Sequence, residues 1–492
     1  MDIRHVACSL AVAPLVLAGL AAPGAGAASA PTPASARVEA RATEAWSTVS
    51  TGAVSLLAQP TMLRTADGAL HVVYQQEVGT QQEYEHATIS GPSAQVTARS
   101  KVVAPWGSLI ADPQLLPSTT GMRLVFSGLQ DSNTGNFFSA GHMYNAVSDA
   151  SGASWTVPAE GLTKSASAYA SYGTSAAVLP DGTSIQGFPL NSGIAYRTGT
   201  IPAAALGPGN TTPADPAFAQ SACCAYYTSM SQTGGTVWMA WYGNGHTADS
   251  EGILVRQVHP TLGGLMVAPS SNRPTGSEFD SFAPSQAVPL VSRADGTTYA
   301  AYCIGTFQCE RLVVWQVGTS TVLDVPGGKG ATGFAMDVTS SGRLWVAYVN
   351  DDEVYAVRSG PTGLRFGGVR EAGRPRQSSD LYKIEVEATD DHADVLVNDG
   401  DAISHIRIDP ALALKASPRA WDGDRAKEVT FKVTDATGGV SGARIRGGGE
   451  TCRTNGAGKC TIQYAPRRPG RITVTAKKAG YAPAEVKLKV RR

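Results

Sequence analysis

Three side chains in one short stretch have the types that β-elimination of a polysaccharide requires. His246 could act as the base, Tyr242 as the acid, and Arg256 could neutralise a uronate carboxylate. The alternative is that all three belong to a polar hairpin loop with no chemical role. Glu278 and Asp280 form a second candidate, an acid and base pair for glycoside hydrolysis. Their alternative is a solvated turn, because two neighbouring loop positions have no fixed separation.

Further candidate contacts lie on segments that we expect to reach the same rim of the molecule. They are aromatic or acidic residues in strand-connecting segments, where binding residues concentrate: Asp112, Trp241, Asp380 and Tyr382. Residues 350–353 (NDDE) and 398–401 (NDGD) could hold calcium through clustered oxygens. Ordinary hairpin turns are the alternative for both. We expect no other cofactor and no catalytic metal.

The N-terminus has the pattern of a secretory signal peptide. Arg4 and His5 precede an apolar stretch over residues 6–22 and the small-residue run GAGAASA. We predict a signal peptide over residues 1–27 and a disordered linker over residues 28–35. No later apolar run reaches the roughly 18–20 residues of a membrane helix. A secreted protein, extracellular or associated with the cell surface and without a membrane span, is therefore expected.

Export makes disulfides plausible for the six cysteines that remain after cleavage. The simplest pairing joins neighbours in sequence, although six cysteines allow many others: Cys223–Cys224, Cys303–Cys309 and Cys452–Cys460. A vicinal Cys223–Cys224 bridge would form a rigid turn that could present a platform to a ligand. Two separate thiols, or a purely structural turn, are the alternatives.

Composition favours an all-β protein with an uneven charge. Charged residues make up 16% of the chain, and the 54 glycines indicate many turns. Residues 411–492 contain 18 Lys and Arg against 6 Asp and Glu, although the formal charge of the whole chain is zero. This uneven distribution of charge indicates what kind of partner the protein binds and does not indicate its fold.

One pattern returns seven times: an apolar run, a turn, and a run of alternating aromatic and aliphatic residues. The turns fall at Gly68, Gly121, Gly182, Gly235, Gly296, Gly342 and Asp391. Each copy is typical of a β-hairpin followed by further strands, and four strands repeated at this spacing are typical of propeller blades. The sequence therefore predicts a seven-bladed β-propeller over residues 36–410, with six blades as the alternative. Residues 36–49 could supply a closing strand for the last blade.

Residues 148–155 (SDASGASW) come close to the pattern S-x-D-x-G-x-T-W, the Asp box of sialidases. The aspartate stands one place early, at Asp149. Residues 359–366 (SGPTGLRF) match the same pattern less well. The region 36–410 thus resembles the sialidase superfamily and its BNR-repeat relatives. That resemblance implies a propeller, and its members include glycosidases, polysaccharide lyases and lectins. A true sialidase is not expected, because Ala58, two residues before Pro60, stands where the family's R-I-P arginine should be.

Residues 411–492 resemble bacterial Ig-like modules. The alternating strands, the T-N-G-A-G-K hairpin around Asn455 and the K-A-G-Y-A stretch carry the likeness and predict a small β-sandwich. A Cys452–Cys460 bridge would staple that hairpin. The basic module could bind anionic envelope polymers, act as a spacer, or only aid solubility.

These patterns favour a secreted, monomeric, glycan-recognising propeller protein. Its expected partner is an extracellular glycan or an anionic cell-envelope polymer and not nucleic acid, since no aromatic platform accompanies the basic residues. The first alternative is a polysaccharide lyase or glycoside hydrolase, and the second is a protein-binding propeller. Whether the protein is an enzyme stays open.

Overall fold

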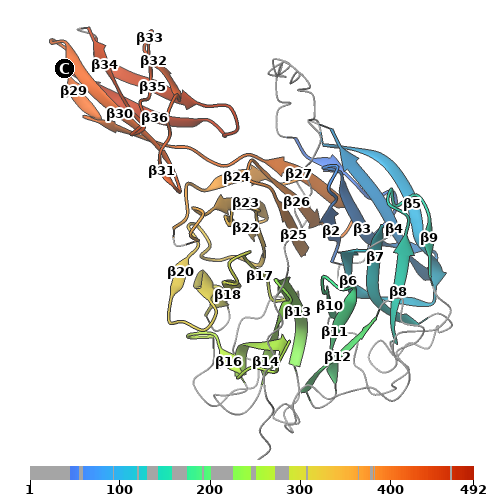
Figure 1. Cartoon of the computed structure of the whole chain (residues 1–492). Coiled ribbons are helices and arrows are strands. Elements are labelled where there is room, and N and C mark those ends of the chain that lie inside the picture. Colours follow the sequence, from blue (N-terminus) through green and yellow to red (C-terminus); the bar gives the residue numbers. More distant parts are fainter. Residues whose placement is uncertain are drawn as a thin grey trace, which may run out of the picture. The chain divides into compact units, whose positions relative to one another are not determined.

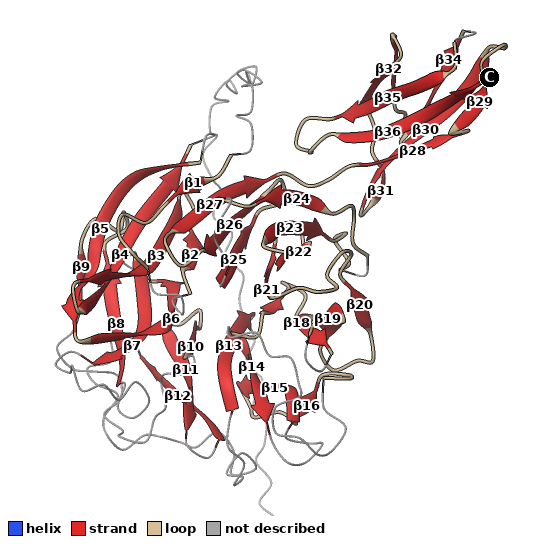
Figure 2. Ribbon diagram, turned by 180° about the vertical axis from the view of Figure 1, so that it is seen from behind, coloured by secondary structure: helices blue, strands red, loops and turns tan. Residues whose placement is uncertain are grey.

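The computed structural model is shown in Figures 1 and 2. It describes residues 45–54, 59–91, 94–118, 121–129, 142–157, 174–190, 193–200, 225–244, 251–271, 287–305, 308–363, 365–376, 381, 383–465 and 468–492. These residues form strands, turns and loops and contain no helix. In this part of the chain there is accordingly no helix of the length and apolarity needed to cross a membrane.

The described residues upstream of residue 411 form seven antiparallel sheets, and we number them in chain order. Sheet 1 contains β2 (Thr61–Arg64), β3 (Leu70–Val78), β4 (Gln81–Ser90) and β5 (Gln95–Trp106). Sheet 2 contains β6 (Ser108–Pro117), β7 (Met122–Leu129), β8 (His142–Ser148) and β9 (Trp155–Thr156). Sheet 3 contains β10 (Ser175–Val178), β11 (Thr183–Leu190) and β12 (Gly193–Thr200). Sheet 4 contains β13 (Ala225–Thr233), β14 (Thr236–Asn244), β15 (Glu251–His259) and β16 (Met266–Val267).

The remaining three sheets follow the same order. Sheet 5 contains β17 (Leu290–Ser292), β18 (Thr298–Ile304), β19 (Arg311–Gln316) and β20 (Val322–Asp324). Sheet 6 contains β21 (Gly333–Val338), β22 (Leu344–Asn350), β23 (Glu353–Arg358) and β24 (Arg370–Gly373). Sheet 7 contains β25 (Lys383–Ala388), β26 (Ala393–Asn398) and β27 (Ile403–Ile408), and its fourth strand is β1 (Ser47–Thr48), far away in sequence.

The first strands of the seven sheets contact one another in a closed ring. Each first strand contacts the next in the order β2, β6, β10, β13, β17, β21 and β25, and β25 contacts β2. Sheets arranged around a common axis in this way form a β-propeller. The ring closes through sheet 7, where Ser47 pairs with His405 and Thr48 with Ser404. This is the closing role that the sequence assigns to residues 36–49.

Neighbouring sheets bury apolar side chains against each other. β22 shows how one strand serves two interfaces, because successive side chains of a strand point to opposite faces. Leu344, Val346 and Tyr348 pack with sheet 5. Trp345, Ala347 and Val349 pack with sheet 7 instead. Both faces are therefore apolar, and the strand shows a continuous apolar run.

The predicted hairpin turns lie between the first and second strands of their sheets. Five of the predicted turn glycines adopt φ between 81° and 87°, a conformation that disfavours side chains: Gly68, Gly182, Gly235, Gly296 and Gly342. The shared geometry shows that these copies are one repeated structural unit.

Two outer turns use the same serine geometry. Ser148 Oγ accepts a hydrogen bond from Met122 N at 3.0 Å and donates to Asp149 O at 2.7 Å. Ser359 Oγ accepts from Leu344 N at 2.8 Å and donates to Gly360 O at 2.7 Å. In each case the serine satisfies the first amide of a buried second strand. Both turns thus hold a sheet together at its outer edge.

Asp149 organises the first of these turns. Its carboxylate accepts hydrogen bonds from the amides of Ser151 at 2.9 Å, Ala153 at 3.2 Å and Ser154 at 3.1 Å. Hydrogen bonds from the Ser154 and Ser151 hydroxyls hold the pKa of Asp149 well below its usual range. The aspartate that stands one place early in the sequence pattern therefore still closes the turn.

The C-terminal strands form two sheets around one core. The first contains β28 (Ala413–Ser417), β30 (Lys427–Asp435), β31 (Gly438–Gly439) and β34 (Lys459–Tyr464). The second, which we call the five-stranded sheet, contains β29 (Ala420–Asp422), β36 (Ala484–Arg491), β35 (Gly470–Lys477), β32 (Arg444–Gly447) and β33 (Glu450–Arg453). Trp421, Phe431 and Tyr464 lie in the core between them.

Two disulfides lie in the described residues, Cys303–Cys309 and Cys452–Cys460. The expected hairpin around Asn455 does not form. β33 pairs with β32 in the five-stranded sheet, whereas β34 pairs with β30 in the other sheet. The turn at Asn455 therefore crosses between sheets, and the Cys452–Cys460 bridge joins the two layers. Cys223 and Cys224 lie outside the described residues.

Candidate functional site

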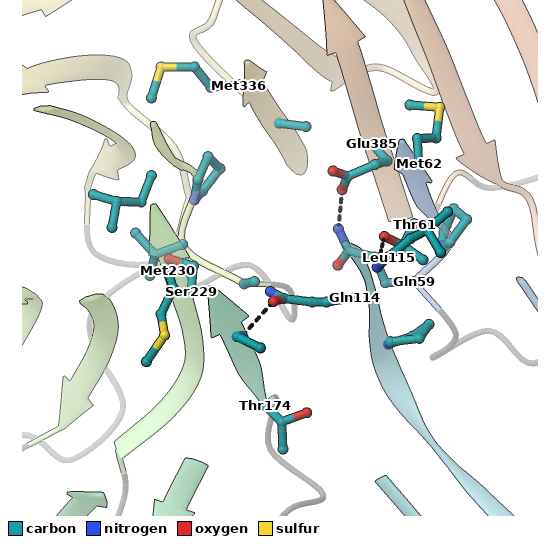
Figure 3. Close-up of a pocket in the computed structure, with 18 of the residues that line it drawn as sticks. Gln59, Thr61, Met62, Gln114, Leu115, Thr174, Ser229, Met230, Met336 and Glu385 are labelled. Atoms are coloured by element: carbon teal, nitrogen blue, oxygen red, sulfur yellow. Dashed lines mark hydrogen bonds between the residues drawn. The ribbon is translucent and has the colours of Figure 1, made fainter. Parts of the chain in front are cut away.

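A cavity of about 230 Å³ lies where the first strands of all seven sheets meet (Figure 3). Each sheet contributes residues of its first strand or residues just before it. The lining residues are Gln59, Pro60, Thr61, Met62, Pro113, Gln114, Leu115, Leu116, Thr174, Ala176, Ser229, Met230, Ala287, Val288, Pro289, Leu290, Phe334, Ala335, Met336 and Glu385. The ring closure thus brings together residues more than 300 positions apart.

Polar side chains of the lining connect neighbouring sheets. Gln59 Nε2 donates a hydrogen bond to Glu385 Oε2 at 2.9 Å, which joins sheets 1 and 7. Thr61 Oγ1 accepts from the Leu115 amide at 3.0 Å, and Gln114 Oε1 accepts from the Ala176 amide at 2.7 Å. Figure 3 shows these three contacts as dashed lines. They fix the polar part of the lining in place.

Two buried oxygens of the lining have no hydrogen-bond partner among the described residues. They are Gln59 Oε1 and Ser229 Oγ, on residues that are each 8% exposed. A buried polar atom without a partner costs free energy, so such atoms are uncommon unless water or a ligand engages them. Gln59 Oε1 can accept a hydrogen bond, and Ser229 Oγ can donate or accept one.

The rest of the lining is apolar. Met62, Leu115, Met230 and Met336 are labelled in Figure 3, and Phe334 also lines the cavity. Methionine side chains are flexible and polarisable and adapt to an irregular ligand surface. The cavity therefore combines hydrogen-bonding groups with apolar contact surface, which is the usual make-up of a small-molecule site.

A second polar cluster joins the end of β2 to β26 and β27 of sheet 7. Arg64 Nη2 is 2.5 Å from Asp394 Oδ2, and His405 Nε2 and Arg407 Nε lie 2.9 Å and 3.0 Å from Asp394 Oδ1. Burial alone would raise the pKa of Asp394, but hydrogen bonds from His392 and His405 lower it well below its usual range. This fully buried carboxylate remains ionised and ties β2 to sheet 7.

Two acidic side chains near Arg64 behave differently. Burial raises the pKa of Asp337 to about 6, although the amides of Ala388 and Val338 donate hydrogen bonds to it. Burial, and then the charge of Asp337, raise the pKa of Glu387 well above its usual value. Both carboxyls therefore accept a proton more readily than ordinary carboxyls do.

The strand register separates the described members of the predicted triad. Tyr242 pairs with Ile253, and Arg256 pairs with Met239 three positions further along the sheet. The alternation of side chains places Tyr242 and Arg256 on opposite faces of sheet 4. Tyr242 packs against sheet 5, whereas Arg256 Nε donates to Gly263 O at 2.6 Å. These two side chains therefore do not converge on one substrate.

The structure places Trp241 in a core and not on a rim. Its side chain is 2% exposed and packs between sheets 3 and 4. Asp112 lies on β6 directly before Pro113 of the cavity lining, and its side chain is outside the described residues. The other candidates also lie outside the described residues: His246, Glu278, Asp280, Asp380 and Tyr382.

The two acidic turns suggested for calcium hold hydrogen bonds of their own. Asn350 Nδ2 donates to Lys329 O at 2.9 Å, and Asp399 Oδ1 accepts from the Ala402 amide at 2.7 Å. Within the described part of the chain, no group of three or more His, Cys, Asp or Glu side chains is placed to share a metal ion. Calcium binding stays an untested prediction.

Sequence reasoning missed the residues that line the cavity. Gln59, Gln114, Ser229 and Glu385 lie at or just before the first strand of a repeated unit. The available signal was the repeat itself, because equivalent first-strand positions of a closed ring must face the axis. The predicted site residues are instead ones expected on strand-connecting segments, since binding residues are common there.

Comparisons with known proteins give remote structural likenesses. No family model matches the sequence, and no curated protein matches it. An ulvan lyase of polysaccharide lyase family PL25 is similar at 13% identity and a TM-score of 0.43, over 72% of this chain and 92% of that one. The polysaccharide lyase Uly1 is similar at 7% identity and 0.44, over 71% and 89%. A mutant Trypanosoma rangeli sialidase with trans-sialidase activity is similar at 10% identity and 0.38, over 71% and 54%.

Proposed function

We propose that this protein is a secreted β-propeller that recognises a glycan, with one sugar residue entering the central cavity. The observation that carries the proposal is the pair of buried, unpartnered oxygens, Gln59 Oε1 and Ser229 Oγ, in the lining of that cavity. A sugar hydroxyl can donate a hydrogen bond to Gln59 Oε1, and a sugar hydroxyl can also accept a hydrogen bond from Ser229 Oγ or donate one to it.

The size and composition of the cavity support a small polar ligand. Its volume of about 230 Å³ is below the roughly 300–1,000 Å³ of sites for drug-sized ligands. The apolar side chains Met230, Phe334 and Met336 offer contact to the C–H face of a sugar ring. Glu385 Oε2 accepts a hydrogen bond from Gln59, which holds this carboxylate in place in the lining.

The domain organisation belongs to the same proposal. We assign the seven sheets to seven blades over residues 36–410 and the C-terminal sheets to an Ig-like module over residues 411–492. The turns at Ser148 and Ser359 would be degenerate Asp boxes, and residues 1–27 and 28–35 a signal peptide and a linker. Disulfides persist in exported proteins, so Cys303–Cys309 and Cys452–Cys460 are compatible with this location.

Replacement of Ser229 tests the cavity. A glycan array probed with the full chain should identify a ligand, and titration calorimetry should then measure its affinity. Ser229→Ala removes one hydrogen-bonding group, so we expect the affinity to fall about 2- to 10-fold. Ser231→Ala is the matched control: Ser231 lies on the same strand, donates to Ser292 at 3.0 Å and does not line the cavity.

Several results would contradict this proposal. Binding to no glycan, or equal affinity of the Ser229→Ala variant and the wild type, would remove the cavity as a glycan site. Unsaturated products from a uronate polymer, lost in His246→Ala, would instead establish a lyase. Capture of a specific envelope protein without glycan binding would favour a protein-binding propeller.

A further inference from the structure

The five-stranded sheet of the C-terminal region has a strongly cationic outer face. In its strands, buried side chains alternate with exposed ones, and the exposed ones share one face. The exposed face carries eight cations: Arg444, Arg446, Arg453, Arg471, Lys477, Lys487, Lys489 and Arg491. It carries only two carboxylates, Asp422 and Glu485. We call this surface the cationic face; its strands are labelled in Figure 1.

The strand register places like charges directly opposite each other. Arg444 pairs with Arg453 on one side and with Lys477 on the other. Arg471 likewise pairs with Lys489. Side chains at such positions are roughly 5 Å apart at Cβ, where like charges are destabilising.

No described carboxylate forms an ion pair with these cations. The ion pairs of the described residues are formed by cations outside the cationic face, such as Arg358 with Asp435 or Arg311 with Asp324. Glu485 accepts a hydrogen bond from Thr475 at 3.2 Å. The cationic face thus keeps a concentrated net positive charge, an arrangement that favours an anionic partner.

The outer face of the other C-terminal sheet provides a contrast. Its register gives a single row of three lysines, Lys415, Lys432 and Lys459. Uncharged side chains such as Thr430 and Thr461 lie beside this row, together with Glu428. The positive charge is therefore concentrated on the outer face of the five-stranded sheet and is not spread evenly over both C-terminal sheets.

The chemistry of the cationic face restricts the class of partner. Trp421, Phe431 and Tyr464 are buried in the core, so none of them can stack on nucleic-acid bases. The large exposed apolar residues of the described chain, Val78, Leu262 and Val369, lie outside the C-terminal sheets and offer this face no means of entering a membrane. What remains is an array of guanidinium and ammonium groups, which bind carboxylates and sulfates by charge-assisted hydrogen bonds.

We propose that the cationic face binds a polyanionic extracellular polysaccharide that carries carboxylate or sulfate groups. Cations on neighbouring strands and along each strand form a two-dimensional array, so an extended chain with repeated charges can contact several of them at once. This site is separate from the central cavity and does not depend on what the cavity binds.

Matched triple variants of the full chain test this proposal. Arg471→Gln/Lys487→Gln/Lys489→Gln removes three charges from the cationic face, and Lys415→Gln/Lys432→Gln/Lys459→Gln removes three from the other face. Binding to heparin and to polygalacturonate is measured by calorimetry at low and at high salt, with neutral dextran as a further control. We expect the first variant to bind about tenfold more weakly and the second less than about twofold. Salt should weaken wild-type binding, because it screens exposed charges.

Several outcomes would overturn this inference. Equal losses in the two triple variants would mean that net charge acts and not the cationic face. Tighter binding to duplex DNA or to phosphatidylglycerol vesicles than to either polysaccharide would assign the face to a different partner. A loss of heparin or polygalacturonate affinity in Ser229→Ala, with no loss in the first triple variant, would assign this binding to the central cavity and not to the cationic face.

Discussion

A pair of buried histidines gives the propeller a titratable contact in its first sheet. His71 Nδ1 lies 2.9 Å from His86 Nε2, and the two rings stack. His86 Nδ1 lies 3.0 Å from Ser100 Oγ, and its ring packs near Trp155 of the neighbouring sheet. Burial, and then the proximity of His71, lower the pKa of His86 to about 4, despite the opposing charge of Asp149.

This lowered pKa predicts acid sensitivity. The unfolded chain takes up a proton at His86 near pH 6.5, whereas the folded protein does so only near pH 4. The free energy of unfolding should therefore keep the full contribution of His86 above about pH 6.5. It should lose that contribution, ~3 kcal/mol, as the pH drops towards 4. Denaturant titrations across this range should show a flatter pH profile for His86→Gln.

His259→Gln is the control for this profile. His259 lies at the end of β15, outside the histidine pair. Its replacement should preserve the slope of stability against pH. An identical slope in the wild type and in His86→Gln would contradict the role given to His86.

At the scale of elements, two outer turns stabilise the second strands of sheets 2 and 6. Ser148 supplies the acceptor for the amide of Met122, a residue that is fully buried. Ser359 does the same for Leu344, which is also fully buried. A side chain that satisfies a buried amide stabilises the fold more than an exposed turn contact does.

Ser148→Ala should lower the free energy of unfolding by about 1–3 kcal/mol, because the Met122 amide loses its partner. Ser359→Ala should have a similar effect through Leu344. Ser151→Ala, in the exposed part of the same turn, should change it by less than about 0.5 kcal/mol. Chemical denaturation measures all three, and equal effects of Ser148→Ala and Ser151→Ala would refute the assignment.

At the scale of the whole molecule, one arginine links the sixth sheet to the C-terminal sheets. Arg358 Nη2 lies 3.4 Å from Asp435 Oδ2 and 3.4 Å from the Tyr481 hydroxyl. Tyr481 donates to Asp435 Oδ2 at 2.8 Å. Burial alone would raise the pKa of Asp435, but hydrogen bonds from Thr437 and Tyr481 lower it overall.

Arg358→Met should uncouple the C-terminal sheets, because it leaves the buried carboxylate of Asp435 without its cation. Removing one partner of a buried ion pair costs about 3 kcal/mol or more. Differential scanning calorimetry should show an earlier transition for the C-terminal sheets. Arg365→Met, at an exposed position nearby, should leave the profile unchanged, and an unchanged profile in Arg358→Met would rule out this coupling.

The sequence by itself determined the all-β class and the repeated unit. Glycines such as Gly68 and Gly296 mark turns because their φ is disfavoured for other residues, and alternating apolar runs mark strands. The closing strand before residue 50 was also predictable, since sheet 7 otherwise ends one strand short. The turn and strand signals are local, so local chemistry suffices to specify them, whereas the closing strand follows from the missing fourth strand of the last copy.

Only the tertiary structure decided which side chains meet. The register of β14 and β15 places Tyr242 and Arg256 on opposite faces, which their sequence spacing could not show. Ring closure brings Gln59 to Glu385 across more than 300 residues. The strands on either side of Asn455 pair in different sheets, so the chain crosses between the two layers there and does not form the expected hairpin. Contacts of this kind depend on strand pairing over long separations, and spacing along the chain contains no information about that pairing.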